Sequence, residues 1–354
     1  MSMGGKKEEV LFVIAQDMLP AMRLIGWCKN IDQSCANRFP AFFRLSLMRS
    51  LVRNGFVRPY SAAYGWRLTA DGYRWLAMHD YPMQPDQHTQ RSKRRFENAA
   101  VAVTMFAAGI SPFMSSIEEF SQQDGYLPAF VLRAGAGQNV LGSNLVTGFI
   151  RIGDSLLSVH YPHAERRVLL QREHDCVQGI ALRCRCTDTG YLFCGESYTS
   201  VYRALLHGQG KRTGEKSGTY GQLAGEALHA CLLSCDLQGA FQMRLMRIPG
   251  YRLLLSMMLG EHAGKMVEMG LPDCDFMDSH LYQPAIISLD MDLCRIRCAA
   301  IQARDAGYSN LLLVVLDFQK TFLEQIFPPP FFRIVIIPDE PIGELEEGAA
   351  RASV

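Results

Sequence analysis

Residues 38–78, RFPAFFRLSLMRSLVRNGFVRPYSAAYGWRLTADGYRWLAM, carry the clearest structural signals in the chain. They predict a helix that begins near Pro40, because proline suits the first helical turn, where its missing N–H is not needed. Asn54-Gly55 is typical of a left-handed helix end. We then expect two short strands, residues 56–58 and 66–68, with a turn between them and a closing helix from Thr69.

The predicted helix has two different faces at about 100° per residue. One face is apolar, and we expect it to be buried: Ala41, Leu45, Met48, Leu51 and Val52. The opposite face carries Phe42, Ser46, Arg49, Ser50 and Arg53. Hydroxyl and guanidinium groups reach phosphates and guanine edges in a DNA major groove. The second face therefore predicts contact with double-stranded DNA.

The sequence Leu-Val-Arg-Asn-Gly-Phe-Val-Arg at 51–58, followed by Trp-Arg-Leu-Thr-Ala-Asp-Gly at 66–72, resembles the winged-helix pattern of bacterial DNA-binding proteins. The resemblance covers roughly residues 8–80. It implies a winged helix-turn-helix in which Arg58 and Arg67 hold the wing against the DNA backbone. The alternative is a winged helix that contacts only other proteins.

Charge is distributed unevenly along the chain. Residues 1–95 hold 15 Lys and Arg against 7 Asp and Glu, whereas the remaining residues hold 21 against 28. Seven arginines but one acid, Asp71, lie between Arg38 and Arg74. Such a concentration is typical of a phosphate-binding surface, so we include Arg38 among the expected DNA contacts.

The sequence predicts four segments: a winged helix over residues 1–80, a linker over 81–95, an α/β domain over 96–338 and a disordered acidic tail over 339–354. The linker ends in a basic cluster of Arg91, Lys93, Arg94 and Arg95. This cluster either clamps DNA beside the wing or forms the solvated start of a helix.

The second domain has the short apolar runs of an α/β fold, either Rossmann-like or a degenerate restriction-endonuclease-like fold. The run Leu311–Leu316 suits a strand that is buried on both faces. Strands are expected at residues 129–132, 148–152, 156–161, 167–170, 191–194, 252–258, 285–289, 311–316 and 332–337, and helices at 197–206, 261–269, 292–306 and 321–327.

Three carboxylates could give this domain nuclease chemistry. Asp317 follows the strongest predicted strand, and Asp290 and Asp292 follow the preceding one. Carboxylates at neighbouring strand ends can share a divalent metal, although polar residues also start ordinary loops there. Cys176, Cys184, Cys186 and Cys194 lack the spacing of a zinc site, and Cys184 and Cys186 are expected on one face of a strand. We predict no resident metal.

No cofactor is expected, because Gly135, Gly137 and Gly142 are not followed by the helix of a dinucleotide-binding motif. No run of apolar residues is long enough to cross a membrane, and the N-terminus does not look like a signal peptide. Eleven cysteines without an export signal favour a reducing cytoplasm.

The overall layout resembles the replication-relaxation-type proteins of bacterial plasmids and integrative elements. This resemblance implies sequence-specific double-stranded DNA binding in plasmid replication, mobilisation or transcriptional control. A homodimer is expected, because one winged helix reads few base pairs. The alternatives are a metal-dependent nuclease that uses Asp317 with Asp290 or Asp292, and an adaptor for another replication or transfer protein.

Overall fold

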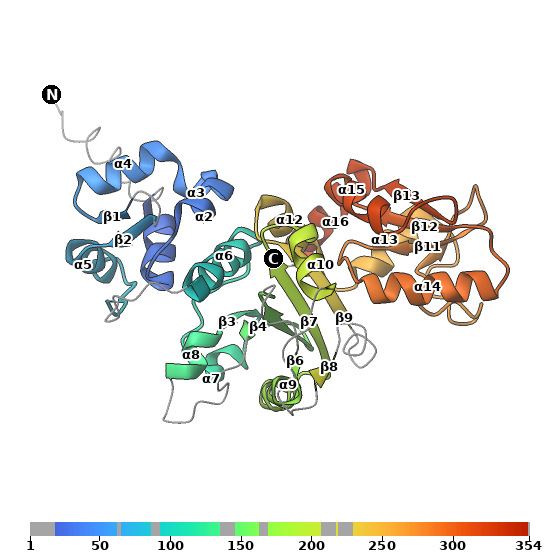
Figure 1. Ribbon diagram of the computed structural model, residues 1–354, viewed down its shortest axis with the longest axis horizontal. Coiled ribbons are helices and arrows are strands. Elements are labelled where there is room, and N and C mark those ends of the chain that lie inside the picture. Colours follow the sequence, from blue (N-terminus) through green and yellow to red (C-terminus); the bar gives the residue numbers. More distant parts are fainter. Residues whose placement is uncertain are drawn as a thin grey trace. The chain divides into compact units, whose positions relative to one another are not determined.

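The computed structural model of the chain describes residues 18–61, 65–85, 93–134, 146–162, 169–206, 217–218 and 229–352. The chain divides into two compact units: the first comprises Met1–Ala107 with Cys235–Leu237, and the second comprises Ala108–Ser234 with Gln238–Val354. Helices and several sheets alternate along it, which confirms the predicted α/β class (Figure 1). Arg91 and the three glycines Gly135, Gly137 and Gly142 lie outside the described residues.

The first unit starts with helical residues 18–28, after which Ile31 forms an isolated antiparallel bridge with Trp66. A hairpin then lies between α4 and α5 (Figure 1). The elements in order are α2 (Gln33–Arg38), α3 (Pro40–Phe43), α4 (Leu45–Arg53), β1 (Val57–Ser61), β2 (Gly65–Leu68), α5 (Ala70–Met78) and α6 (Lys93–Ala107).

Local sequence explains several boundaries in this unit. The Thr69 side chain caps α5 by accepting a hydrogen bond from Gly72 N at 3.1 Å. Gly55, with φ of +75°, confirms the predicted left-handed end of α4. Gly65 also has φ of +75°, and a Cβ there would lie 1.7 Å from Ile31 O. Only glycine fits where β2 meets Ile31.

The predicted helix from Pro40 to Arg53 is interrupted at Arg44, whose φ of −54° and ψ of 139° are not helical. Its buried face is therefore different from the expected one. Ala41, Leu45 and Val52 are exposed, so their predicted burial is wrong. Met48 and Leu51 are buried as expected, and Phe43 and Leu47 are buried with them. The break shifts the helical phase, which one continuous period could not show.

Helix α6 belongs to the first unit, whereas the sequence placed residues 96–108 in the second domain. It begins at Lys93, within the predicted linker. The Phe106 ring contacts the Phe42 ring edge-on, with 5.3 Å between centroids. The first unit therefore extends to Ala107.

The second unit contains a five-stranded sheet in the order β3-β4-β5-β7-β9. β3, β4 and β5 are antiparallel neighbours, and β5, β7 and β9 are parallel. The strands are β3 (Gly125–Pro128), β4 (Val146–Ile152), β5 (Ser155–His160), β7 (Asp188–Gly195) and β9 (His229–Ser234), and their helices are α7 (Ile117–Phe120), α8 (Ala129–Ala134), α9 (Gln171–Cys184) and α10 (Tyr198–Leu206). A small pair, β6 (Leu169–Leu170) and β8 (Ser217–Gly218), is separate.

A four-stranded sheet in the order β10-β11-β12-β13 completes the second unit, and β11, β12 and β13 are parallel. Its elements are α12 (Leu237–Met246), α13 (Tyr251–Leu259), β10 (Phe276–Met277), β11 (Pro284–Ile287), α14 (Leu293–Asp305), β12 (Leu311–Val315), α15 (Asp317–Ile326), β13 (Phe332–Ile336) and α16 (Asp339–Ala352).

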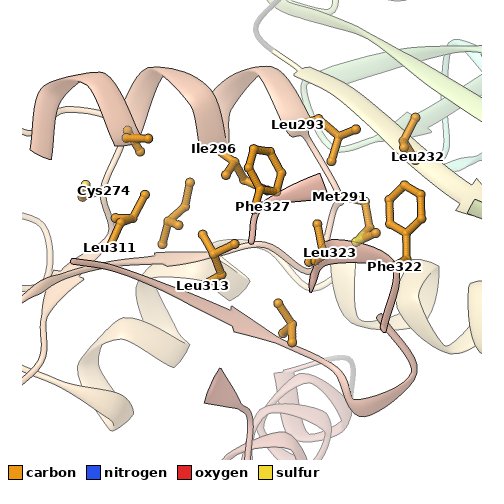
Figure 2. Close-up of a cluster of buried hydrophobic side chains, with 14 of the residues drawn as sticks. Leu232, Cys274, Met291, Leu293, Ile296, Leu311, Leu313, Phe322, Leu323 and Phe327 are labelled. Carbon is orange, nitrogen blue, oxygen red and sulfur yellow. The ribbon is translucent and has the colours of Figure 1, made fainter. Parts of the chain in front are cut away.

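The predicted burial of β12 on both faces is confirmed. Leu311 and Leu313 pack in one cluster with side chains of α14 and α15, including Ile296 and Leu323 (Figure 2). Leu312, Val314 and Leu316 pack in a second cluster, which includes side chains from α13 and α16. Alternation along a strand sends successive side chains to opposite faces, so this one strand is shared by two cores.

Several predicted elements are wrong. Residues 129–132 form helix α8, and residues 252–258 lie in helix α13, because short apolar runs do not distinguish a strand from a buried helix. Residues 261–269 form turns rather than a helix, and α9 was not predicted. The tail expected to be disordered forms α16, held by buried Leu345. Among the described residues, no helix combines the length and apolar character needed to cross a membrane.

Candidate nucleic-acid interface

Helix α4 presents a polar surface opposite its buried side. Leu47, Met48 and Leu51 fix the orientation of the helix in the core. This orientation leaves Ser46, Arg49 and Arg53 exposed. Arg49 and Arg53 are one helical turn apart, so their side chains leave the same face as neighbours. We call Ser46, Arg49 and Arg53 the α4 surface.

The neighbouring residues of the predicted DNA-binding face have other roles. Ser50 is half-buried and accepts a hydrogen bond from Asn54 Nδ2 at 3.4 Å. Phe42 is also half-buried and packs against Phe43 and Phe106. Phe42 therefore serves as a packing residue, and the polar part of the expected face is narrower than the sequence indicated.

The hairpin brings Arg58 and Arg67 into register as direct neighbours on β1 and β2. Arg58 is exposed, as contact with a DNA backbone requires. Arg67 is only 9% exposed. Ile31 forms a bridge with Trp66, the residue next to Arg67, and therefore lies alongside this part of β2. The expected phosphate contact from Arg67 is not available on this surface.

The remaining predicted contacts are dispersed. Arg38 lies in the last turn of α2 and is half-buried. Lys93 is exposed at the start of α6, whereas Arg94 and Arg95 are half-buried. Of the described part of the basic cluster, Lys93 alone is exposed.

Arg44, which the sequence did not single out, is also exposed, at the N-cap position of α4. The helix break that puts it there depends on the packing of Phe39 and Phe43, both buried. The one available signal was its spacing, five residues before Arg49, within the run of arginines.

Two cysteines near the start of the chain are part of the core of the first unit. Cys28 and Cys35 are both buried. Burial raises the pKa of the Cys28 thiol to about 12, and it also raises the pKa of Cys35. Because the thiolate is the reactive and metal-binding form, neither side chain suits a redox or metal role near the α4 surface.

The carboxylates proposed for a nuclease are engaged in structural contacts. Asp290 is buried and forms an ion pair with Arg252, whose Nε also donates to Tyr251 Oη at 3.1 Å. Asp292 caps α14 by accepting hydrogen bonds from Cys294 N and Arg295 N, both at 3.1 Å. Its other oxygen accepts from Ala230 N at 3.0 Å.

Asp317 is exposed at the first turn of α15. Gln319, two residues later, is fully buried, and its side chain joins the ends of two strands. It accepts from Leu316 N at 3.0 Å and donates to Leu289 O at 2.8 Å. In the part of the chain that the structure describes, no three His, Cys, Asp or Glu side chains group as metal ligands.

The cysteines considered for zinc do not form a ligand group among the described residues, and Cys176 and Cys184 both lie in α9. Cys184 ends helix α9 rather than lying on a strand, and Cys194 is in β7. Burial raises the pKa of Cys184 to about 11. These side chains act as small core hydrophobes.

Two polar features of the second unit were not anticipated. Asp275 and Arg295, each 11% exposed, form an ion pair at 2.6 Å. His160 is buried at the end of β5, with Nε2 3.1 Å from Ser158 Oγ, and burial lowers the pKa of its imidazole to about 3. Asp275 and Arg295 are 20 residues apart in sequence, so no local pattern indicates their ion pair.

Comparison with protein-family models, curated proteins and solved structures finds no match for this chain.

Proposed function

We propose that the first unit is a winged helix that binds double-stranded DNA, with α4 in the major groove and the β1–β2 hairpin as the wing. The observation that carries this proposal is the α4 surface, where Arg49 and Arg53 stand one turn apart beside an exposed hydroxyl. Guanidinium groups with this spacing suit phosphates and guanine edges.

The order of elements supports the proposal. A helix over residues 18–28, a single bridged residue at Ile31, α2, α3, α4, a hairpin and α5 follow one another, and Ile31 pairs with β2 of the hairpin. Exposed Arg58 lies on that hairpin, near the end of α4. A helix with base-contacting residues and a neighbouring basic hairpin can contact the groove and the backbone together.

We further propose that the protein acts in plasmid replication, mobilisation or transcriptional control in the cytoplasm, as a homodimer on DNA. For the second unit, the parallel strands β11, β12 and β13 with crossovers α14 and α15 support the Rossmann-like alternative. The engaged state of Asp290 and Asp292 gives no support to nuclease chemistry, so we do not propose it.

A titration with labelled duplex DNA tests this proposal. The full chain is mixed with a random-sequence duplex of about 30 base pairs, and anisotropy is measured over a series of salt concentrations. Replacing Arg49 and Arg53 together with alanine removes two phosphate or base contacts. The slope of log K against log salt is expected to fall by about 1.8 for two lost phosphate contacts. Stoichiometry from the same titration is expected to be two protomers per bound site.

A charge-matched control keeps the test specific. Arg297→Ala with Arg333→Ala removes two exposed arginines from the second unit and is expected to leave the salt slope unchanged. Trp27, Trp66 and Trp75 are the three tryptophans of the chain and all belong to the first unit, so their fluorescence reports whether its fold survives. An unchanged slope in a folded Arg49/Arg53 variant would contradict the proposal.

A further inference from the structure

The second unit contains a cavity of about 510 Å³ on one side of its five-stranded sheet. Leu157 of β5 and Cys231 of β9 line it from the sheet, and Met246 and Ile248 line it from the end of α12 and the residues that follow. This volume lies within the usual range for small-molecule sites, roughly 300–1,000 Å³. The lining is mainly apolar, as such sites require.

The cavity also lies at the carboxyl end of β11, through Asp290. The backbone there joins the two sheets, because Leu232 N donates to Asp290 O at 3.2 Å. Open α/β sheets bind ligands in such crevices at strand carboxyl ends.

The wall opposite the sheet is held in place by side-chain contacts. Arg247 donates to Gly109 O at 2.5 Å and to Ala108 O at 3.3 Å, which fixes the segment between α12 and α13. Arg252 at the start of α13 is tied to Asp290 and to Tyr251. A wall with these anchors is preformed, so binding would not require it to be ordered first.

The charge of the lining selects the kind of ligand. Four charged side chains line the cavity: Asp124, Asp154, Arg252 and Asp290. Arg252 neutralises Asp290, so two carboxylates remain. Both are exposed at the mouth, where Asp154 follows Gly153 and Asp124 accepts a hydrogen bond from Gly153 N at 2.9 Å. A mouth with this charge attracts cations and repels phosphates and carboxylates.

We propose that this cavity binds a small organic cation, with an apolar body against Leu157, Met246 and Ile248 and an ammonium group between Asp124 and Asp154. The apolar body fills the dry part of the cavity. The ammonium group gains charge-assisted hydrogen bonds at the wetter mouth. This site is independent of DNA binding by the first unit.

Two probes that differ mainly in charge test the proposal: 2-phenylethylamine, a cation, and 3-phenylpropionate, an anion with the same ring and linker. The full chain carries ¹³C-methyl methionine, and the Met246 resonance is assigned with Met246→Leu. The amine is expected to shift this resonance in a saturable way and to raise the melting temperature. The anion is expected to do neither.

Variants of the lining residues show which side chains contribute to the affinity for the amine. Asp124→Asn with Asp154→Asn removes both charges at the mouth and is expected to weaken amine binding about tenfold, a change of about 1.4 kcal/mol. The control Asp305→Asn with Glu340→Gln removes two exposed charges elsewhere in the second unit and is expected to leave binding unchanged. Ser155→Trp, which places a ring in the cavity, is expected to abolish the Met246 shift.

Three results would overturn the proposal. They are a Met246 resonance that neither probe moves at millimolar concentration, equal binding of the two probes, and unchanged amine affinity in the double aspartate variant. The aspartate variant retains the Gly153 contact, because an asparagine oxygen also accepts a hydrogen bond. It therefore keeps the test decisive even if Ser155→Trp does not fold.

Discussion

The two units use charge in opposite ways. In the first unit, Arg49, Arg53 and Arg58 are exposed, and within the described residues none of them makes an ion pair. In the second unit, Arg252 and Arg295 are largely buried and are paired with Asp290 and Asp275. Exposed charges contribute little to stability but are available to a partner, whereas buried pairs are needed by the fold. The exposed arginines of the first unit therefore suit binding to a partner, and the paired arginines of the second unit suit a structural role.

The largest expected effect is a loss of stability when Arg295 is replaced. This variant tests the role of a buried ion pair in the second unit. Arg295→Met leaves Asp275 buried without its counter-charge, which is expected to lower the free energy of unfolding by about 3–5 kcal/mol. Urea unfolding followed by circular dichroism measures this change. Arg297→Met, an exposed position on the same helix, and Arg49→Met in the first unit are the controls, each expected within about 0.5 kcal/mol of wild type. A loss of similar size at all three positions would remove the contrast.

The next effect tests whether the units unfold separately. Leu51→Ala in the first unit and Leu313→Ala in the second unit each truncate a fully buried side chain. Each is expected to lower the free energy of unfolding of its unit by about 2–5 kcal/mol. Since all three tryptophans are in the first unit, Leu51→Ala is expected to shift the fluorescence transition. Leu313→Ala is expected to shift the circular dichroism transition and leave fluorescence unchanged. A fluorescence transition that Leu313→Ala shifts as far as the circular dichroism transition would show that the units unfold together.

The smallest of the three effects concerns pH and His160. Its pKa is about 3 in the folded protein and 6.5 as an ordinary imidazole, so the unfolded chain binds the proton more readily. Stability from the neutral imidazole is complete above pH 6.5 and is lost as pH falls toward 3. Between pH 6.5 and pH 5 the loss is expected to be about 2 kcal/mol.

His160 packs beside the rings of Tyr191 and Phe193, and replacing it by phenylalanine is expected to remove this dependence. Unfolding in urea at about pH 7 and pH 5 is compared for wild type, His160→Phe and the exposed control His280→Gln. The same pH sensitivity in His160→Phe as in wild type would assign the loss to other groups.

Local chemistry made parts of the fold predictable. The Asn54-Gly55 end of α4, the Thr69 cap and the doubly buried β12 follow from residue types at fixed positions. The buried face of α4 did not follow, because the break at Arg44 is set by how Phe39 and Phe43 pack. Helix α13 was missed because its run of leucines and methionines fits a strand equally well.

The candidate site was predictable to a similar extent. Ser46, Arg49, Arg53 and Arg58 are exposed as expected, since their polar type and spacing are local properties. The burial of Arg67 and Phe42 was not predictable, because it depends on how Ile31 pairs with Trp66 and how Phe106 packs against Phe42. Asp290 looked like a metal ligand until its partner Arg252, 38 residues away, was located. Long-range partners decide whether a charged residue is available.

The shared position of β12 determines how the second unit can open. Each amide of β12 lies in a ladder between β11 and β13, and each of its faces is covered by a separate core. Fraying of an edge strand exposes one ladder, but exposure of β12 requires both cores to come apart at once. Its backbone protons are therefore expected to exchange with solvent only when both of these cores open, which makes β12 a slowly exchanging segment of the unit.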